Sequence, residues 1–111
     1  MTQRPTPLPG RPVRGSTTGR PIMALLDLLG RRWALRVLWE LRDDSSPTFR
    51  QLQQRCDGVS SSVLAERLRE LGEADLVEHA GDGYHLTGQG KSLFGTLARL
   101  DAWAADWRPR A

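Results

Sequence analysis

The chain has 111 residues, of which 39% are hydrophobic and 26% are charged, a composition that indicates one globular domain with a single core. Sixteen basic and 13 acidic residues give a net charge of +3 and a pI near 10.0, but residues 1–20 hold four arginines and no acid, which leaves 12 basic and 13 acidic residues in 21–111. The lone cysteine, Cys56, excludes an intramolecular disulfide, and no apolar run is long enough for a membrane span or a signal peptide, so we expect a soluble, cytoplasmic protein.

Residues 1–20 are rich in proline, glycine, serine and threonine, with Leu8 and Val13 as the only sizeable apolar residues after the initial methionine. Such a segment buries too little apolar surface to offset the entropy of ordering, so we predict a disordered tail over 1–20. Pro21 suits the first turn of a helix, and a folded domain is predicted over 21–111. The tail arginines either add non-specific DNA affinity through phosphate contacts or belong to an inert extension.

Apolar residues recur with helical spacing in the first half of this domain and predict three helices. The first covers 21–29 and the second about 32–42. Thr48 and Gln51 are spaced as a capping box, so a third helix is predicted over 49–56.

The second half predicts a helix, a hairpin and a last helix. Ser60 is the expected N-cap of a fourth helix, which has leucines along one face and fades around residues 72–74. Two short strands follow, joined by a tight turn at 80–83. Thr87 is the expected cap of the last helix, whose apolar residues cover more than one face.

Two short helices joined by the four-residue turn 57–60, the second followed directly by a hairpin, have the order of a winged helix-turn-helix. The predicted fold class is mainly α with a small β-hairpin, a winged helix DNA-binding domain whose terminal helices form a dimer interface. The fourth helix is the one expected to enter the major groove. Residues 47–69 carry four arginines and two acids, a local charge of +2 where the phosphate backbone would lie.

Seven residues on or near these two helices are expected to contact DNA: Arg50, Gln51, Ser60, Ser61, Ser62, Arg67 and Arg69. Hydroxyl and N–H groups at the start of the fourth helix favour phosphate, and capping alone is the alternative role for the serines. Arg50 is either a phosphate contact or a solvated surface charge. The DNA contact of Arg67 is implied only by the family resemblance given below; the alternative is an ion pair with an acid such as Glu70 or Asp75.

The last helix is apolar on more faces than a monomer of this size needs to cover. We therefore expect a homodimer in which the first and last helices bury Leu25, Leu26, Leu29, Leu93, Leu97, Leu100, Trp103 and Trp107. The alternative is that these side chains fold back on Trp33 and Trp39.

Three further residues invite a chemical interpretation. Cys56 is either a packed core residue or a redox switch. His79 and His85 flank the hairpin turn and would face each other as a metal pair if the loop had three residues; exposed strand histidines are the alternative. No nucleophile with a base and no carboxylate pair is spaced for catalysis, so we expect no enzyme activity, no catalytic residue, no metal and no cofactor.

Taken together, six segments of the chain resemble the HxlR-type bacterial winged helix-turn-helix regulators. In chain order they are 29–33 (LGRRW), 49–52 (FRQL), 58–60 (GVS), 64–71 (LAERLREL), 75–77 (DLV) and 84–90 (YHLTGQG). The resemblance implies a small DNA-binding transcription factor that works as a homodimer joined through its first and last helices. Members of the family respond to varied signals or to none known, so the resemblance leaves any small-molecule effector unidentified.

The chain departs from the family pattern in three places. Arg20 stands where many members have a cysteine before the proline that opens the first helix, so thiol sensing at that position is not expected. The wing is short and has Asp82 at its tip, so deep insertion into the minor groove is not expected. The tail over 1–20 is not part of the pattern.

The sequence thus predicts a sequence-specific transcriptional repressor, located with the nucleoid, whose homodimer sets two reading helices into successive major grooves of a pseudo-palindromic operator. The alternative is a winged-helix module that binds protein and has no specific DNA binding. The slight negative charge of residues 21–111 and the acidic wing suggest it.

Overall fold

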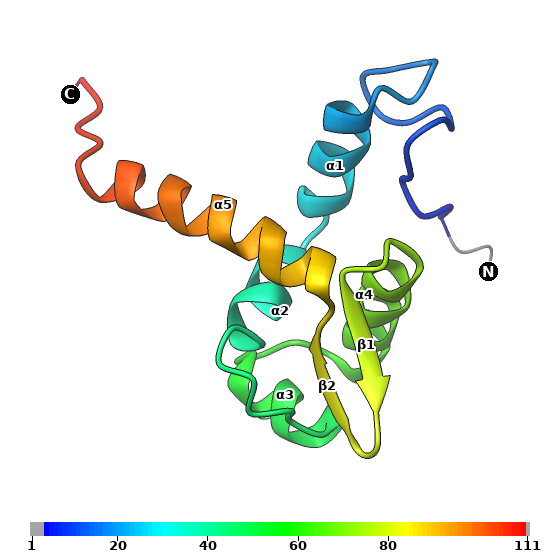
Figure 1. Ribbon diagram of the computed structural model, residues 1–111, viewed down its shortest axis with the longest axis vertical. Coiled ribbons are helices and arrows are strands. Elements are labelled where there is room, and N and C mark those ends of the chain that lie inside the picture. The colour runs from blue at the N-terminus through cyan, green and yellow to red at the C-terminus, as the bar shows by residue number, and fades with distance from the viewer. Residues whose placement is uncertain (1–3, 111) are drawn as a thin grey trace.

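The computed structural model describes residues 4–110, so the parts of the predicted tail and domain at residues 1–3 and 111 lie outside the described residues. Within this range five helices and two strands follow in the predicted order (Figure 1): α1 Pro21–Leu29, α2 Ala34–Glu40, α3 Phe49–Arg55, α4 Ser61–Glu73, β1 Val77–Ala80, β2 Gly83–Leu86 and α5 Gly88–Ala105. α2 is shorter than predicted, because Trp33 takes a left-handed backbone conformation (φ 76°) at its N-cap and Leu41 leaves helical geometry at its end.

The predicted helix caps are confirmed. The Thr48 hydroxyl accepts from the Gln51 N–H at 3.2 Å, and the Gln51 side-chain oxygen accepts from the Thr48 N–H at 2.9 Å. Ser60 and Thr87 cap α4 and α5, each accepting from the N–H three residues further on, at 3.2 Å and 3.0 Å. These bonds satisfy N–H groups that a helix start leaves without partners.

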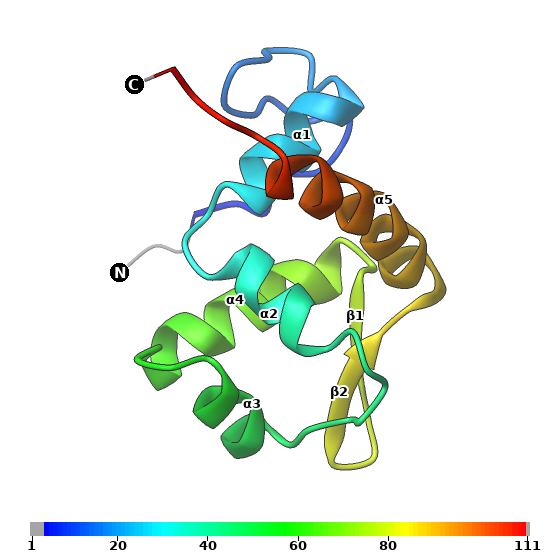
Figure 2. The ribbon, with the colours of Figure 1, turned by 90° about the vertical axis from the view of Figure 1, so that its left-hand side faces the viewer.

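The core lies where α2, α3 and α4 pack together beside the hairpin (Figure 2). The large side chains that are less than 2% exposed include Val37, Leu38, Leu41, Leu52, Leu64 and Leu71. The leucine stripe of α4 is therefore core, which leaves the opposite face of the helix to other tasks.

The hairpin has a two-residue loop, Gly81 and Asp82, because Ala80 pairs with Gly83. In this register His79 pairs with Tyr84, on which it stacks with ring centroids 4.2 Å apart, and Glu78 pairs with His85. The two histidines therefore do not face each other, and the metal-pair interpretation, which required a three-residue loop, does not apply to this register.

The start of α5 is bonded to the turn between α4 and β1. The Thr87 hydroxyl donates to the Asp75 carbonyl at 2.6 Å, and the Gln89 amide donates to the Asp75 carboxylate at 2.5 Å. At Gly90, an added Cβ would lie 2.1 Å from the Leu76 carbonyl oxygen, so this contact needs glycine. Two of the segments that carry the family resemblance, 75–77 and 84–90, are thus in direct contact with each other.

Residues 4–20 follow a defined path over α1 and α4, where composition predicts disorder (Figures 1 and 2). Thr6 is 2% exposed, the Pro5 carbonyl accepts from the Arg31 guanidinium at 2.7 Å, and the Arg14 N–H donates to the Asp27 carboxylate at 3.2 Å. The structure differs from the prediction because hydrogen bonds to side chains of the domain hold the segment. The prediction of disorder was based on the number of apolar residues, which takes no account of such bonds.

The C-terminal half of α5 extends away from the rest of the domain (Figure 1). Trp103 and Trp107 stack on each other with ring centroids 6.0 Å apart and are 62% and 58% exposed, so they do not fold back on the body. Trp39 packs instead near Phe94, at 5.6 Å. Among the described helices, none combines the length and the apolarity that crossing a membrane requires.

Candidate nucleic-acid interface

α3, the N-terminal end of α4 and the hairpin tip lie on the side of the domain away from α1 and α5 (Figure 2). The turn between α3 and α4 depends on Gly58, whose φ of +83° lies in the left-handed region that favours glycine. Val59, 6% exposed, anchors the turn in the core. The local sequence thus fixes the direction in which α4 leaves the turn.

The first turn of α4 presents three serine hydroxyls. Ser61 and Ser62 are exposed; the Ser61 hydroxyl accepts from the Gln53 amide at 3.0 Å, and the Ser62 hydroxyl lies 3.4 Å from that of Ser60. The sequence analysis missed Gln53, which ties α3 to the start of α4, because no spacing motif marks a contact that depends on the angle between two helices. The positive end of the helix dipole and the hydroxyls together suit a phosphate group.

Arg50 and Gln51 lie in the first turn of α3. Arg50 is exposed, and within residues 4–110 its guanidinium forms no ion pair and no hydrogen bond. The Gln51 side-chain oxygen is used in the capping box, which leaves its amide nitrogen as the group able to reach DNA.

Arg67 is tied into a buried ion-pair network. Its Nη1 contacts the Glu70 carboxylate at 2.5 Å and its Nε donates to the Arg32 carbonyl at 2.7 Å. Glu70, 1% exposed, also pairs with Arg31 of the α1–α2 turn. Arg67 thus takes Glu70, one of the acids expected as an alternative partner, and anchors α4 to the start of α2.

Arg69 lies between two carboxylates of its own helix. It pairs with Glu66 one turn before and with Glu73 at 2.5 Å one turn after, and it lies 3.4 Å from the Thr6 hydroxyl. The hydrogen bond from Arg69 holds the pKa of Glu66 below its usual range, and the same carboxylates hold the pKa of Arg69 above its own. Arg69 therefore faces the N-terminal segment, away from the serines.

Arg55 is also committed within the domain: it donates to the Ser45 hydroxyl at 2.8 Å and to the Glu40 carbonyl at 3.2 Å. Of the four arginines in residues 47–69, only Arg50 lacks a side-chain partner among the described residues. The local charge of +2 is thus largely used to hold α2, α3 and α4 together.

Cys56 ends α3 and is completely buried in the core. Burial raises the pKa of its thiol, because the thiolate would lose its hydration. A buried thiol with a raised pKa is unreactive, which favours the packing role over the redox switch.

The terminal helices carry a second surface, which is apolar. Leu26 is 54% exposed and Leu100 is 60% exposed, and Trp103 of α5 and Trp107, which follows it, are exposed as well. Leu29 belongs to the core, and Leu25, Leu93 and Leu97 are partly buried against it. Exposed apolar residues that the sequence analysis did not include are Ile22, Leu35 and Trp39.

A helix-turn-helix followed directly by a two-stranded wing, with the N-terminus of its second helix exposed, defines a winged helix-turn-helix transcriptional regulator that binds DNA. The model of the HxlR-like helix-turn-helix family matches residues 28–111. The chain belongs to this family, which confirms the resemblance found in the sequence.

Similar proteins agree with this assignment. Quinone-bound YodB from Bacillus subtilis superposes with a TM-score of 0.72 at 30% identity, covering 78% of this chain and 97% of YodB. An uncharacterized HTH-type transcriptional regulator of Methanocaldococcus jannaschii is 28% identical over 90 residues, 78% of this chain and 84% of its own. The regulator YvaP of Bacillus subtilis is 29% identical over 89 residues, 74% of this chain and 82% of its own.

Proposed function

We propose that the protein is a repressor that binds a specific pseudo-palindromic operator as a homodimer. The observation that carries the DNA contact is the exposed start of α4, where Ser61 and Ser62 lie on the same side of the domain as α3, whose exposed Arg50 has no side-chain partner among the described residues (Figure 2). In this arrangement Arg50 and the helix N-terminus hold phosphates, and the exposed residues of the first turns of α4 reach base edges. Repression follows from occupancy of DNA that other proteins need.

The proposed contact set is narrower than the seven residues expected from the sequence. Arg50, Gln51, Ser60, Ser61 and Ser62 remain in it. Arg67 and Arg69 serve instead as positioning residues for α4, because carboxylates of the same helix already hold them.

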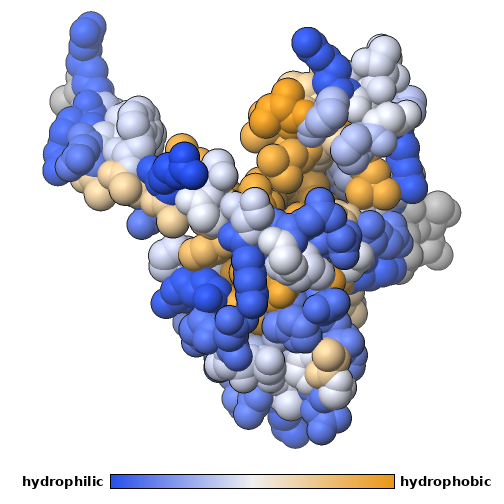
Figure 3. Space-filling model, in the orientation of Figure 1, coloured by the Kyte–Doolittle hydropathy of each residue, from blue (hydrophilic) through white to orange (hydrophobic). Residues whose placement is uncertain are grey.

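The homodimer is proposed from the apolar surface of α1 and α5. Figure 3 shows hydrophobic side chains gathered on α1 on the side that faces α5. Ile22 and Leu26 of α1, Leu100 and Trp103 of α5, and Trp107 just after α5 are each more than half exposed, and a second copy would cover them. Two reading helices related by a two-fold axis would then meet half-sites about 34–36 Å apart.

The test is fluorescence anisotropy of the full chain with the DNA upstream of its own coding region and with a random duplex, over a salt series. We expect a large preference for the upstream DNA at physiological salt. Arg50→Gln should weaken binding to both duplexes and reduce the salt slope by about 2, because each subunit of the dimer loses one phosphate contact. Arg99→Gln, at an exposed position of α5, is the matched control and should leave both unchanged.

Equal binding to both duplexes that vanishes with salt would contradict a specific regulator. An unchanged salt slope for Arg50→Gln would contradict the docking through α3 and α4. A protein that binds chromosomal DNA works where that DNA is, so we propose a cytoplasmic, nucleoid-associated location.

A further inference from the structure

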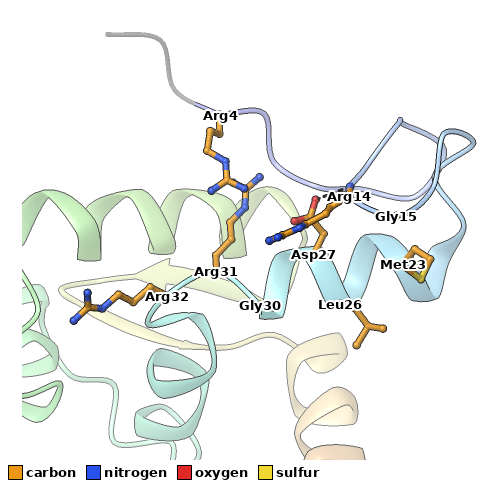
Figure 4. Close-up of a pocket in the computed structure, with 9 residues that line it drawn as sticks. All are labelled: Arg4, Arg14, Gly15, Met23, Leu26, Asp27, Gly30, Arg31 and Arg32. Atoms are coloured by element: carbon orange, nitrogen blue, oxygen red, sulfur yellow. Dashed lines mark hydrogen bonds between the residues drawn. The ribbon is translucent and has the colours of Figure 1, made fainter.

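A basic hollow lies between the N-terminal segment and α1, on the other side of the domain from the proposed DNA contacts (Figures 2 and 4). Its volume is about 390 Å³, and Arg4, Arg14, Arg31 and Arg32 line it. Asp27 is the one carboxylate among its lining residues. A neighbouring hollow of about 740 Å³ shares three of these arginines and adds Arg11.

The positive charge of the arginines that line the hollow is only partly compensated by nearby carboxylates. Within residues 4–110, the guanidinium groups of Arg4, Arg14 and Arg32 form no ion pair and no side-chain hydrogen bond, whereas Arg31 shares Glu70 with another arginine. Figure 4 shows Arg4 and Arg31 projecting toward each other from opposite walls, with Arg14 beside Asp27. Positive groups that converge on a semi-enclosed space raise the local concentration of anions.

Arg31 supplies an independent observation. Its side chain is 5% exposed and donates to Glu70 and to the Pro5 carbonyl, yet its Nε is buried with no hydrogen-bond partner. Buried donors in native proteins are nearly always paired. The Arg31 guanidinium thus lacks one acceptor, which adds to the uncompensated positive charge beside the hollow.

We propose that this hollow is a binding site for a small organic dianion, a phosphate monoester or a dicarboxylate. Guanidinium groups bind phosphate and carboxylate through paired hydrogen bonds, and the volume falls within the range of small-molecule sites, about 300–1,000 Å³. The charged end of the ligand contacts Arg4, Arg14 and Arg31. Its apolar body lies toward Met23 and Leu26, which form the other side of the hollow.

The site is connected to the reading helix through Arg31, which pairs with Glu70 of α4. A dianion that contacts Arg31 competes with Glu70 for the same guanidinium and so changes how α4 is held. This regulatory consequence rests on the proposed function, whereas the binding of the anion does not.

Calorimetric titration of the full chain with phenyl phosphate and with phthalate tests the site. We expect saturable binding of one ligand per chain and at least a tenfold loss of affinity in the variant Arg4→Gln/Arg14→Gln. The matched control, Arg99→Gln/Arg108→Gln, removes the same charge from the other end of the chain, at two exposed positions, and should bind as the native chain does.

Failure to saturate, or equal affinity in the two double variants, would overturn the proposal. Inorganic phosphate binding as tightly as phenyl phosphate would overturn the assignment to an organic ligand. In anisotropy, phenyl phosphate should shift the affinity for the upstream DNA in the native chain and not in Arg4→Gln/Arg14→Gln. Binding in calorimetry without that shift in DNA affinity would overturn only the regulatory link. If the chain bound no DNA at all, the proposed function would be refuted, and calorimetry would still show whether the hollow binds the anion.

Discussion

Glu70 is a single carboxylate on the buried face of α4, 1% exposed, and it accepts bonds from both Arg31 and Arg67. Those two arginines come from the α1–α2 turn and from α4 itself, so this carboxylate joins the turn to the helix. A buried carboxylate adds little net stability when it is fully paired, but its removal leaves cations without compensation. Replacing Glu70 should therefore lower the stability of the fold markedly.

We predict that Glu70→Gln lowers the free energy of unfolding by about 3–5 kcal/mol, the range for breaking a buried pair. Urea unfolding followed by far-UV circular dichroism measures it. Glu73→Gln, at an exposed position of the same helix, should cost much less. Similar losses in the two variants would show that the buried network is not what holds α4.

Two glycines of α5 give a matched pair. An alanine Cβ at Gly90 would lie 2.1 Å from the Leu76 carbonyl oxygen, whereas at Gly95 it would meet nothing within 4 Å. Gly90→Ala should destabilise the fold by about 1–3 kcal/mol through overpacking, and Gly95→Ala should stabilise it by about 0.5–1 kcal/mol through helix propensity. Thermal unfolding measures both. A Gly90→Ala variant as stable as the native chain would mean that the contact between the start of α5 and the Leu76 carbonyl can adjust to an added methyl group.

At the scale of elements, α4 performs two tasks with different parts of its surface. Its first turn carries the serines of the proposed DNA contact, and its last two turns carry the ion pairs that face the N-terminal segment. Arg69 lies between Glu66 and Glu73 there. The hydrogen bond from the Thr6 hydroxyl, and secondly the hydrogen bond from Arg69, hold the pKa of Glu73 below its usual range. Lowered carboxyl pKa values make this end of α4 sensitive to acid.

We predict that this sensitivity depends on Arg69. A carboxyl whose pKa is lower in the folded chain stabilises the fold above its unfolded pKa, about 4.3 for Glu, and loses that contribution as the pH falls through the folded value. Urea unfolding between about pH 5.5 and 3 should therefore show a shallower loss of stability for Arg69→Gln than for the native chain. Arg99→Gln should follow the native curve; parallel curves for all three chains would refute the assignment.

At the scale of the whole molecule, the surfaces for which we propose functions lie at two opposite ends of the domain. One end carries α3, the start of α4 and the wing, and the other carries α1, the projecting part of α5 and the basic hollow (Figures 1 and 3). α5 has 18 residues, and its last two turns contact little of the body. An exposed apolar helix of this length is unfavourable in water, which is why we propose a second copy as its partner.

We predict that Leu100→Asp converts the proposed dimer to a monomer, because Leu100 is 60% exposed on the projecting part of α5 and a charge buried there would oppose association. Sedimentation velocity measures the change. Gln54→Asp adds the same charge at an exposed position of α3 and should leave the dimer intact. A native chain that sediments as a monomer would contradict the proposed assembly outright.

The elements followed closely from the sequence because their signals are local. The Thr48 and Gln51 pair marks the start of α3, and Ser60 marks the start of α4, through bonds that span three residues. The candidate site was harder to predict. For Arg67 the sequence left a DNA contact and an ion pair with an acid such as Glu70 both open, and for Arg69 it favoured a DNA contact. Counting charges along a helix does not show which of these contacts the folded chain makes.

The sequence by itself determined the order of helices and strands and the family, since caps, turns and apolar spacing act over a few residues. Only the tertiary structure decided which arginines are free, because Arg31 and Glu70 are 39 positions apart and meet through packing. The same holds for residues 4–20: their composition predicts disorder, and side chains of α1, α4 and the α1–α2 turn supply the hydrogen bonds that place them. Long-range polar contacts of this kind have no periodic signature in a sequence, so they become visible only when the chain is folded.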